Sequence, residues 1–155
     1  MTGIVVIGAG QAGASCVTKL RSLGYQGKIT LIGEESVPPY QRPPLSKKYL
    51  LGEMELERLY LRPASYYAEN GIDLHLNETV TAIDRKDKVV IAGGQQIAYD
   101  DLVLTTGSVP RRLPGAVGGE LQGVYVVREL KDVDSMAPEF EAGRHVLIVG
   151  GGYIG

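Results

Sequence analysis

Cysteine is almost absent from this chain of 155 residues, since Cys16 is the single one. One cysteine cannot form an internal disulfide, which is typical of proteins in a reducing compartment, so we expect a cytoplasmic location. Histidine is equally scarce: His75 and His145 stand far apart, and with one cysteine they make no set of metal ligands. We therefore expect no metal site.

Blocks of like charge and long apolar runs are also missing. Lysine and arginine total 16 against 18 acidic residues, and no basic cluster of the kind that binds nucleic acid stands out. The longest apolar runs, residues 4–7 and 146–149, are far shorter than the ~20 residues that span a bilayer. No positively charged start precedes a hydrophobic segment, so a secretory signal is not expected. These absences predict neither a nucleic-acid partner nor a membrane.

Glycine, in contrast, is abundant: 21 of 155 residues, about twice the usual share. Several belong to a repeat, because IVVIGAGQAG (residues 4–13) recurs as VLIVGGGYIG (residues 146–155). The offset is too long for a solenoid and indicates one supersecondary unit used at the start of two domains. We expect a first domain over residues 1–143 and the beginning of a second over residues 144–155. Because the second copy ends at its last glycine, we expect the front piece of a longer protein.

Hydrophobic periodicity predicts an α/β fold. Strands are expected over residues 3–7, 28–32, 72–76 and 101–105, and helices over residues 12–23, 45–51, 63–70 and 128–136. Further short strands are expected over residues 79–83, 88–91 and 96–99, with a hairpin turn at Gly93 and Gly94. The alternation of strand, helix and strand at the front predicts a parallel sheet, into which an antiparallel meander is inserted later.

The first glycine-rich turn carries the clearest chemistry. Gly8 permits a tight turn after the strand, Gly10 lets a pyrophosphate approach the backbone, and Gly13 lets the next helix pack closely on the strand. The helix N-terminus offers free amides and partial positive charge to phosphates. Glu34 follows Gly13 by 21 residues, at the end of the second strand, where a carboxylate binds ribose hydroxyls. These features predict a dinucleotide site; the alternative is a glycine-rich turn beside a solvated glutamate.

The second turn repeats the three spaced glycines at residues 150–155. As a repeat of the first turn it predicts a second nucleotide site. Two dinucleotide sites in one polypeptide are typical of a flavoenzyme that is reduced by a nicotinamide cofactor. NAD and NADP are not distinguished, because the deciding side chain would follow the next strand.

Three segments carry a resemblance to a known family: YQRPPLSK at residues 40–47, LVLTTGSVPR at residues 102–111 and GGGYIG at residues 150–155. In this order and spacing they resemble the FAD-dependent pyridine nucleotide-disulfide oxidoreductases, and among them the ferredoxin reductases of bacterial oxygenase systems. The resemblance covers essentially the whole chain and implies an FAD/NAD(P)-binding Rossmann-like sheet. Thr105 departs from it, standing where alanine is common, and Ser108 stands where glycine is frequent.

The resemblance implies an enzyme that oxidises NADH and passes electrons through FAD to a ferredoxin-type iron–sulfur protein of an oxygenase or cytochrome P450 system. The residues implied for FAD are Gly8, Gly10, Ala12 and Gly13 at the pyrophosphate, Glu34 at the ribose, Arg42 and Lys47 near the flavin, Val80 at the adenine end, and Thr106, Gly107 and Arg128 along the cofactor. Those implied for NADH are Gly150, Gly152, Tyr153, Ile154 and Gly155. No side chain is expected to act as an acid–base catalyst.

A cation beside the flavin ring would stabilise the negative charge of the reduced form, which is the role implied for Lys47. From spacing alone, Lys47 would instead lie on a solvated helix face and Arg42 in an exposed loop. Two other functions stay open at this point. Flavoproteins similar to apoptosis-inducing factor share the proline–lysine motif and act partly by forming complexes, and the chain could also be a cofactor-binding module without catalysis.

Cysteine usage separates the chain from other branches of the same fold. Disulfide reductases carry a Cys-x4-Cys pair on the helix after the second strand, whereas residues 43–51 contain no cysteine. The resemblance therefore excludes dithiol chemistry of the lipoamide or glutathione type.

Overall fold

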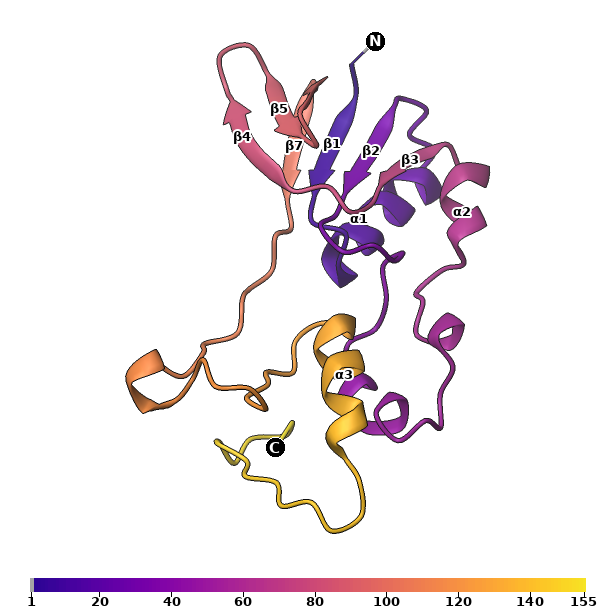
Figure 1. Cartoon of the computed structure of the whole chain (residues 1–155). Coiled ribbons are helices and arrows are strands. Elements are labelled where there is room, and N and C mark those ends of the chain that lie inside the picture. Colours follow the sequence, from indigo (N-terminus) through magenta and orange to yellow (C-terminus); the bar gives the residue numbers. More distant parts are fainter. Residues whose placement is uncertain (1) are drawn as a thin grey trace. The chain divides into compact units, whose positions relative to one another are not determined.

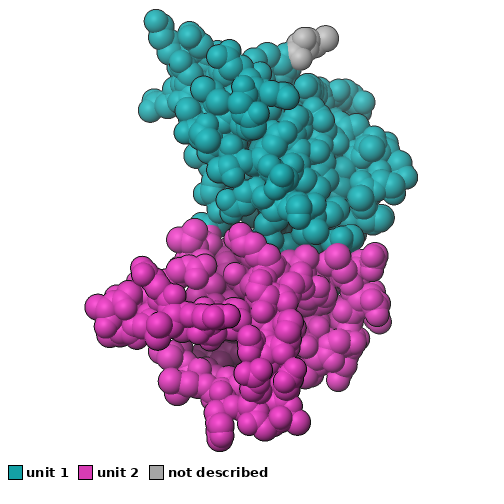
Figure 2. Space-filling view, in the orientation of Figure 1, with its two compact units in different colours: residues 1–41, 60–107 teal, residues 42–59, 108–155 magenta. Residues whose placement is uncertain are grey.

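The computed structural model describes residues 2–155, which fall into two compact units coloured separately in Figure 2. Unit 1 consists of the chain up to residue 41 together with residues 60–107, and unit 2 consists of residues 42–59 and 108–155. Each unit is built from two stretches that are distant in sequence. The units are described separately below.

Unit 1 is organised around a parallel sheet of four strands (Figure 1). In spatial order the strands are β3 (Ile72–His75), β2 (Ile29–Ile32), β1 (Ile4–Ile7) and β7 (Asp101–Leu104). Strand β1 lies in the middle, and its last residue Ile7 is in register with Ile32 on one side and Leu104 on the other. The carboxyl ends of three strands therefore meet at one edge. The predicted parallel sheet is confirmed, with each strand end within one residue of the expected place.

Two helices, α1 (Gln11–Ser22) and α2 (Ala64–Glu69), pack against one face of this sheet (Figure 1). Alternate strand residues point to this face, because successive side chains of a strand lie on opposite sides. The buried cluster consists of Val6, Val17, Ile29, Leu31, Tyr67 and Ile72. Burial of this apolar surface supplies the main driving force for docking the helices.

The other face of the sheet is covered by an antiparallel sheet of β4 (Val80–Asp84), β5 (Val89–Ala92) and β6 (Gln95–Ala98). The turn between β5 and β6 is formed by Gly93 and Gly94, whose φ angles are +54° and +77°. Two consecutive positive φ angles favour glycine in a two-residue hairpin. The second buried cluster lies between the two sheets and consists of Val5, Ile7, Ile32, Val90, Ala92 and Tyr99. The inserted meander is thus confirmed.

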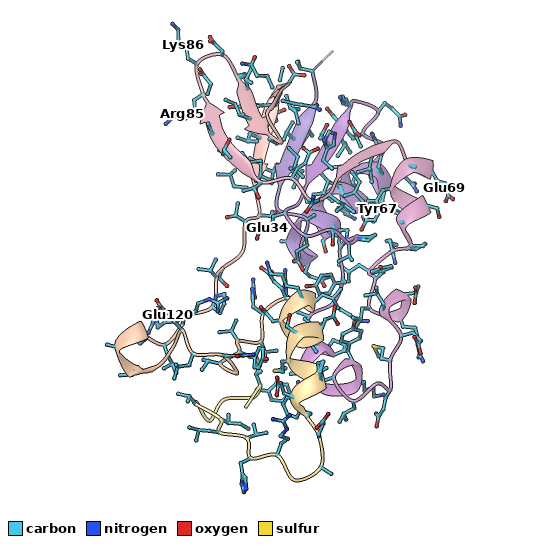
Figure 3. All side chains as sticks on the ribbon, in the orientation of Figure 1. Glu34, Tyr67, Glu69, Arg85, Lys86 and Glu120 are labelled. Carbon is cyan, nitrogen blue, oxygen red and sulfur yellow. The ribbon has the colours of Figure 1, made fainter. Side chains whose placement is uncertain are left out.

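Tyr67 belongs to the first buried cluster, and only 1% of the surface of this residue is exposed (Figure 3). Its hydroxyl has no hydrogen-bond partner among residues 2–155. Burial penalises the phenolate and raises the pKa of Tyr67 from its usual 10 to about 12, while the nearby charge of Arg62 opposes this rise. The unfolded chain would ionise first, so stability should fall as the pH rises from about 10 to about 12.

Between pH 10 and pH 12 the free energy of unfolding of the parent chain should fall by about 2–3 kcal/mol through this ionisation. We expect Tyr67→Phe to lack this decrease, because it has no phenol at this position to ionise on unfolding. At pH 7 the variant should be more stable by about 1 kcal/mol, since an unpaired buried hydroxyl is gone. Urea denaturation at neutral and alkaline pH measures both effects. The exposed Tyr125 provides the control substitution, Tyr125→Phe. An unchanged pH dependence in Tyr67→Phe would contradict the prediction.

Unit 2 has little regular structure. Its elements are the π-helix η1 (Leu45–Tyr49), the short 3-10 helices η2 (Leu56–Arg58), η3 (Gly115–Val117) and η4 (Ala137–Glu139), and the α-helix α3 (Leu130–Met136). The helix expected at residues 128–136 begins two residues later because Asp132 accepts hydrogen bonds from the amides of Arg128 and Glu129 at 3.0 and 2.8 Å. These bonds form a capping arrangement at the start of α3.

The helix expected over residues 45–51 is a widened turn and not a regular α-helix. The amides of both Lys47 and Tyr49 donate to the carbonyl of Pro44, at 2.9 and 3.0 Å. Lys47 itself has non-helical angles, φ −132° and ψ −113°, which divide the segment. Because the angles of Lys47 lie outside the helical region, the regular ladder of hydrogen bonds is interrupted at this residue.

Residues 146–149, which repeat the apolar run of residues 4–7, do not form a strand. These four residues are 57–88% exposed and have no regular secondary structure. A parallel strand needs a neighbour with which to share hydrogen bonds, and within residues 2–155 this segment pairs with none. No helix in the part of the chain that the structure describes is both long and apolar enough to cross a membrane.

Candidate cofactor-binding site

The turn between β1 and α1 contains two glycines at positions where the main chain leaves no room for a side chain. Gly8 has a φ of +111°, and a Cβ atom built on it would lie 2.2 Å from the carbonyl oxygen of Thr105. A Cβ atom on Gly13 would lie 2.1 Å from the carbonyl oxygen of Gly8. Both distances are far inside van der Waals contact. Gly8 and Gly13 are therefore required for the backbone of the turn to close, as the sequence predicts for the tight turn and the close helix.

Gly10 differs from the other two, because a Cβ atom built on it would meet no atom within 4 Å. It is the N-cap of α1, it makes no side-chain cap, and the first turn of the helix contains no acidic residue. The first amides of a helix have no intrahelical acceptor and carry partial positive charge. Open space in front of such amides fits a phosphate group. Ala12, in this first turn, is exposed on the surface.

Glu34 lies at the same sheet edge, two residues after β2 (Figure 3). The amide of Gly33 donates to the carbonyl of His75 at 2.8 Å, which anchors the start of this segment. The adjacent Glu35 accepts a hydrogen bond from the Tyr40 hydroxyl at 2.5 Å, whereas Glu34 is exposed. Of the two neighbouring carboxylates, Glu34 is thus the one presented at the edge.

The end of β7 contributes the other predicted residues of unit 1. Thr106 and Gly107 follow the strand and are exposed, and Gly107 has a φ of +69°. Val80, the first residue of β4, packs its side chain on the cluster between the sheets. Its side chain is therefore structural, and a cofactor contact there would use the main chain.

Thr105 is the residue that sequence reasoning missed. Its hydroxyl lies 2.9 Å from the carbonyl of Gly8 and 3.1 Å from that of Ile7. The resemblance marked it only as a departure from alanine. Nothing in the local sequence signals these contacts, because 97 residues separate Thr105 from Gly8.

Arg42 and Arg128, both predicted to contact FAD, are in contact in unit 2. Nη1 of Arg42 donates to the main-chain carbonyl of Arg128 at 2.6 Å. The amide of Arg128 is held by Asp132 at 3.0 Å, so the main chain at Arg128 is fixed from both sides. The structure therefore brings Arg42 and Arg128 together, although 86 residues separate them.

Lys47 and Tyr153 form a second long-range pair in unit 2. The Nζ atom of Lys47 lies 4.4 Å from the centre of the Tyr153 ring, a distance typical of a cation–π contact. Tyr153 remains 89% exposed, so the pair is open to solvent. A residue predicted for the first cofactor thus touches one predicted for the second.

The second glycine motif keeps the turn of the first although no strand precedes it. Gly150 has a φ of +118°, close to the +111° of Gly8. A Cβ atom on Gly155 would lie 2.7 Å from the carbonyl oxygen of Gly150, while one on Gly152 would meet nothing within 4 Å. Ile154, next to the last glycine, is 61% exposed. The repeat therefore extends from the sequence to the backbone.

The arrangement in unit 1 suits a nucleoside diphosphate group. Phosphates would face the amides at the start of α1, next to Gly10, and ribose hydroxyls would face Glu34. No group of three or more histidine, cysteine or acidic side chains within residues 2–155 could hold a metal ion.

Known proteins resemble this chain along nearly its whole length. A ferredoxin–NAD(P)(+) reductase of a Sphingomonas species is 42% identical over 153 residues, covering 98% of this chain and 37% of that protein. A rubredoxin–NAD(+) reductase of Pseudomonas putida is also 42% identical over 153 residues, covering 98% of this chain and 40% of that protein. The crystal structure of a covalent putidaredoxin reductase–putidaredoxin complex superposes with a TM-score of 0.85 at 39% identity, covering 92% of this chain and 35% of that chain.

The chain thus spans well under half of the length of these relatives. The four-stranded parallel sheet and the antiparallel meander of this chain, together with the structural match, confirm the predicted fold class. The family model described as pyridine nucleotide-disulphide oxidoreductase matches residues 2–155, and the chain belongs to this family.

Proposed function

We propose that this chain is part of an FAD-dependent reductase that oxidises NADH and passes electrons to a ferredoxin-type iron–sulfur protein of an oxygenase or cytochrome P450 system. The observation that carries the proposal is the β1–α1 turn, which is closed at Gly8 and Gly13 but open at Gly10, with Glu34 at the same edge. The names of the relatives, a ferredoxin–NAD(P)(+) reductase and a rubredoxin–NAD(+) reductase, support the choice of reaction.

The residues of this chain would bind and orient the cofactors. In unit 1, the proposed FAD contacts are Gly8, Gly10, Ala12, Gly13, Glu34, Val80, Thr106 and Gly107; in unit 2, they are Arg42, Lys47 and Arg128. The proposed NADH contacts are Gly150, Gly152, Tyr153, Ile154 and Gly155. Bound flavin would supply the conversion between two-electron and one-electron chemistry. Residues 1–143 would form the first part of the FAD-binding domain and residues 144–155 the start of the NADH-binding domain. A cytoplasmic location stays a prediction based on cysteine content.

The test uses the chain alone and the chain extended by any coding sequence that follows Gly155. FAD is titrated into each protein, and the flavin absorbance and fluorescence report binding. NADH is then added with a [2Fe–2S] ferredoxin or with rubredoxin, whose bleaching reports electron transfer. We expect the extended protein to retain FAD and to reduce one of these acceptors. Failure to bind FAD would contradict the cofactor assignment, and bound FAD without acceptor reduction would contradict the reductase assignment.

Lys47 provides a sharper prediction about the flavin. Replacing it by methionine removes one positive charge that would stabilise the reduced, anionic ring. We expect the midpoint potential of bound flavin to become more negative by on the order of 50 mV in Lys47→Met. Spectroelectrochemical titration measures this shift. The neighbouring Lys48 is exposed, so Lys48→Met is the matched charge control. Equal potentials in both variants would remove the role proposed for Lys47.

A further inference from the structure

We propose that the hydroxyl of Thr105 is a positioning group for the phosphate-binding turn, which deepens the proposed function and rests on it. Thr105 follows β7 and is half-buried beside the β1–α1 turn. Its amide donates to the carbonyl of Ile7 at 2.8 Å, extending the pairing of β7 with β1 by one residue. Its hydroxyl then reaches the carbonyls of Ile7 and Gly8, at 3.1 and 2.9 Å.

The carbonyl of Gly8 is the group that this hydroxyl controls. A hydroxyl has one proton to donate, and the shorter of its two contacts is with Gly8. The peptide between Gly8 and Ala9 is planar and trans, so its carbonyl and its amide point in opposite directions. Holding the Gly8 carbonyl towards Thr105 therefore turns the amide of Ala9 away from Thr105. Backbone amides orientated in this way are what a phosphate-binding turn uses.

The same hydroxyl also lies against the start of α1. A Cβ atom built on Gly13 would be 3.0 Å from the Thr105 hydroxyl oxygen, as well as 2.1 Å from the Gly8 carbonyl oxygen. Thr105, Gly8 and Gly13 thus meet at one point, where the end of β7 contacts both sides of the turn. A hydrogen bond at this point fixes the turn before any ligand arrives, and preorganisation of this kind increases affinity.

The experiment compares Thr105→Val with Thr105→Ser. Valine keeps the shape of threonine but loses the hydrogen bond, whereas serine keeps the hydroxyl. Thr81→Val is the matched control, because the Thr81 hydroxyl also bonds a main-chain carbonyl, that of Ile91 at 3.4 Å, within the antiparallel sheet. The probes are ADP and adenosine, which differ only in the two phosphates. NMR titration of the 155-residue chain covers weak binding, and melting temperature reports stability.

We expect Thr105→Val to bind ADP about threefold to tenfold more weakly, the effect of one lost hydrogen bond, with unchanged affinity for adenosine. Thr105→Ser and Thr81→Val should bind both probes as the parent chain does. Equal loss for ADP and adenosine, or no loss for either, would overturn the positioning role while leaving the proposed function intact. If the parent chain binds ADP no better than adenosine, both the positioning role and the proposed phosphate site are wrong.

Discussion

Replacing Gly13 by alanine should destabilise unit 1 by about 2–3 kcal/mol, because overpacking a closed backbone contact forces the chain to shift. The added Cβ atom would lie 2.1 Å from the Gly8 carbonyl oxygen, and neither backbone segment can move as freely as a side chain. Urea denaturation followed by circular dichroism measures the loss. A variant as stable as the parent chain would show that α1 can slide along β1 without cost.

Gly10→Ala is the matched comparison for the same added methyl group. Its Cβ atom meets nothing within 4 Å and the φ of −90° is accessible to alanine, so only the preference of an N-cap for glycine over alanine is lost, and we expect a destabilisation of no more than about 1 kcal/mol. A methyl group at this glycine should nevertheless keep a pyrophosphate from approaching the backbone closely. FAD and ADP affinity should therefore fall by at least about tenfold. Unchanged affinity in this variant, measured by the same titrations, would contradict the placement of the phosphates next to Gly10.

Arg21 is expected to give the second large effect, on stability alone. Its guanidinium donates four hydrogen bonds to main-chain carbonyls: to Tyr25 at 2.6 Å, Gly27 at 2.9 Å, Asn70 at 2.7 Å and Gly71 at 2.6 Å. These carbonyls belong to the chain before β2 and to the end of α2, so one side chain ties three segments together. The planar guanidinium of arginine has five donors in a fixed arrangement and can reach several carbonyls at once, whereas the compact ammonium group of lysine cannot.

We expect Arg21→Met to lower the free energy of unfolding by about 2–4 kcal/mol, because several half-buried carbonyls lose charged donors. Arg21→Lys should recover less than half of this loss. Arg85→Met, at the tip of the hairpin between β4 and β5, removes an equal charge at an exposed position and should change stability by less than about 0.5 kcal/mol (Figure 3). A loss in Arg21→Met no larger than in Arg85→Met would contradict the prediction.

Most elements of unit 1 could be predicted from sequence because their signals are local. The strand–turn–helix of residues 4–22, the Gly93–Gly94 hairpin and the short apolar strands all follow from patterns within about ten residues. In unit 2 such signals are weak. The segment at residues 45–51 contains helix-forming residues, yet its hydrogen bonds converge on Pro44, and its π-helix was not predicted. Residues 146–149 have the apolar composition of a buried strand, but a strand forms only where a neighbouring strand shares its hydrogen bonds.

The candidate site, too, could be predicted from the sequence only in part. Glycine spacing in the first turn was enough to predict a phosphate-binding loop, because the turn, the helix start and the close packing are all properties of six consecutive residues. The spacing also indicated which glycines close the turn and which leaves space, but not what Gly8 closes against. That contact is with Thr105, which is distant in sequence and adjacent in space.

By itself, then, the sequence determined the class of sheet, the first phosphate loop and its repeat, and the carboxylate expected at the sheet edge. Tertiary structure decided the rest: that Glu35 is bonded by Tyr40 while Glu34 is exposed, that Arg42 holds Arg128, and that Lys47 lies against Tyr153. The physical reason is the range of each interaction. Periodicity and turn chemistry act between neighbours in the chain, whereas side chains that share a site are brought together only when the chain has folded.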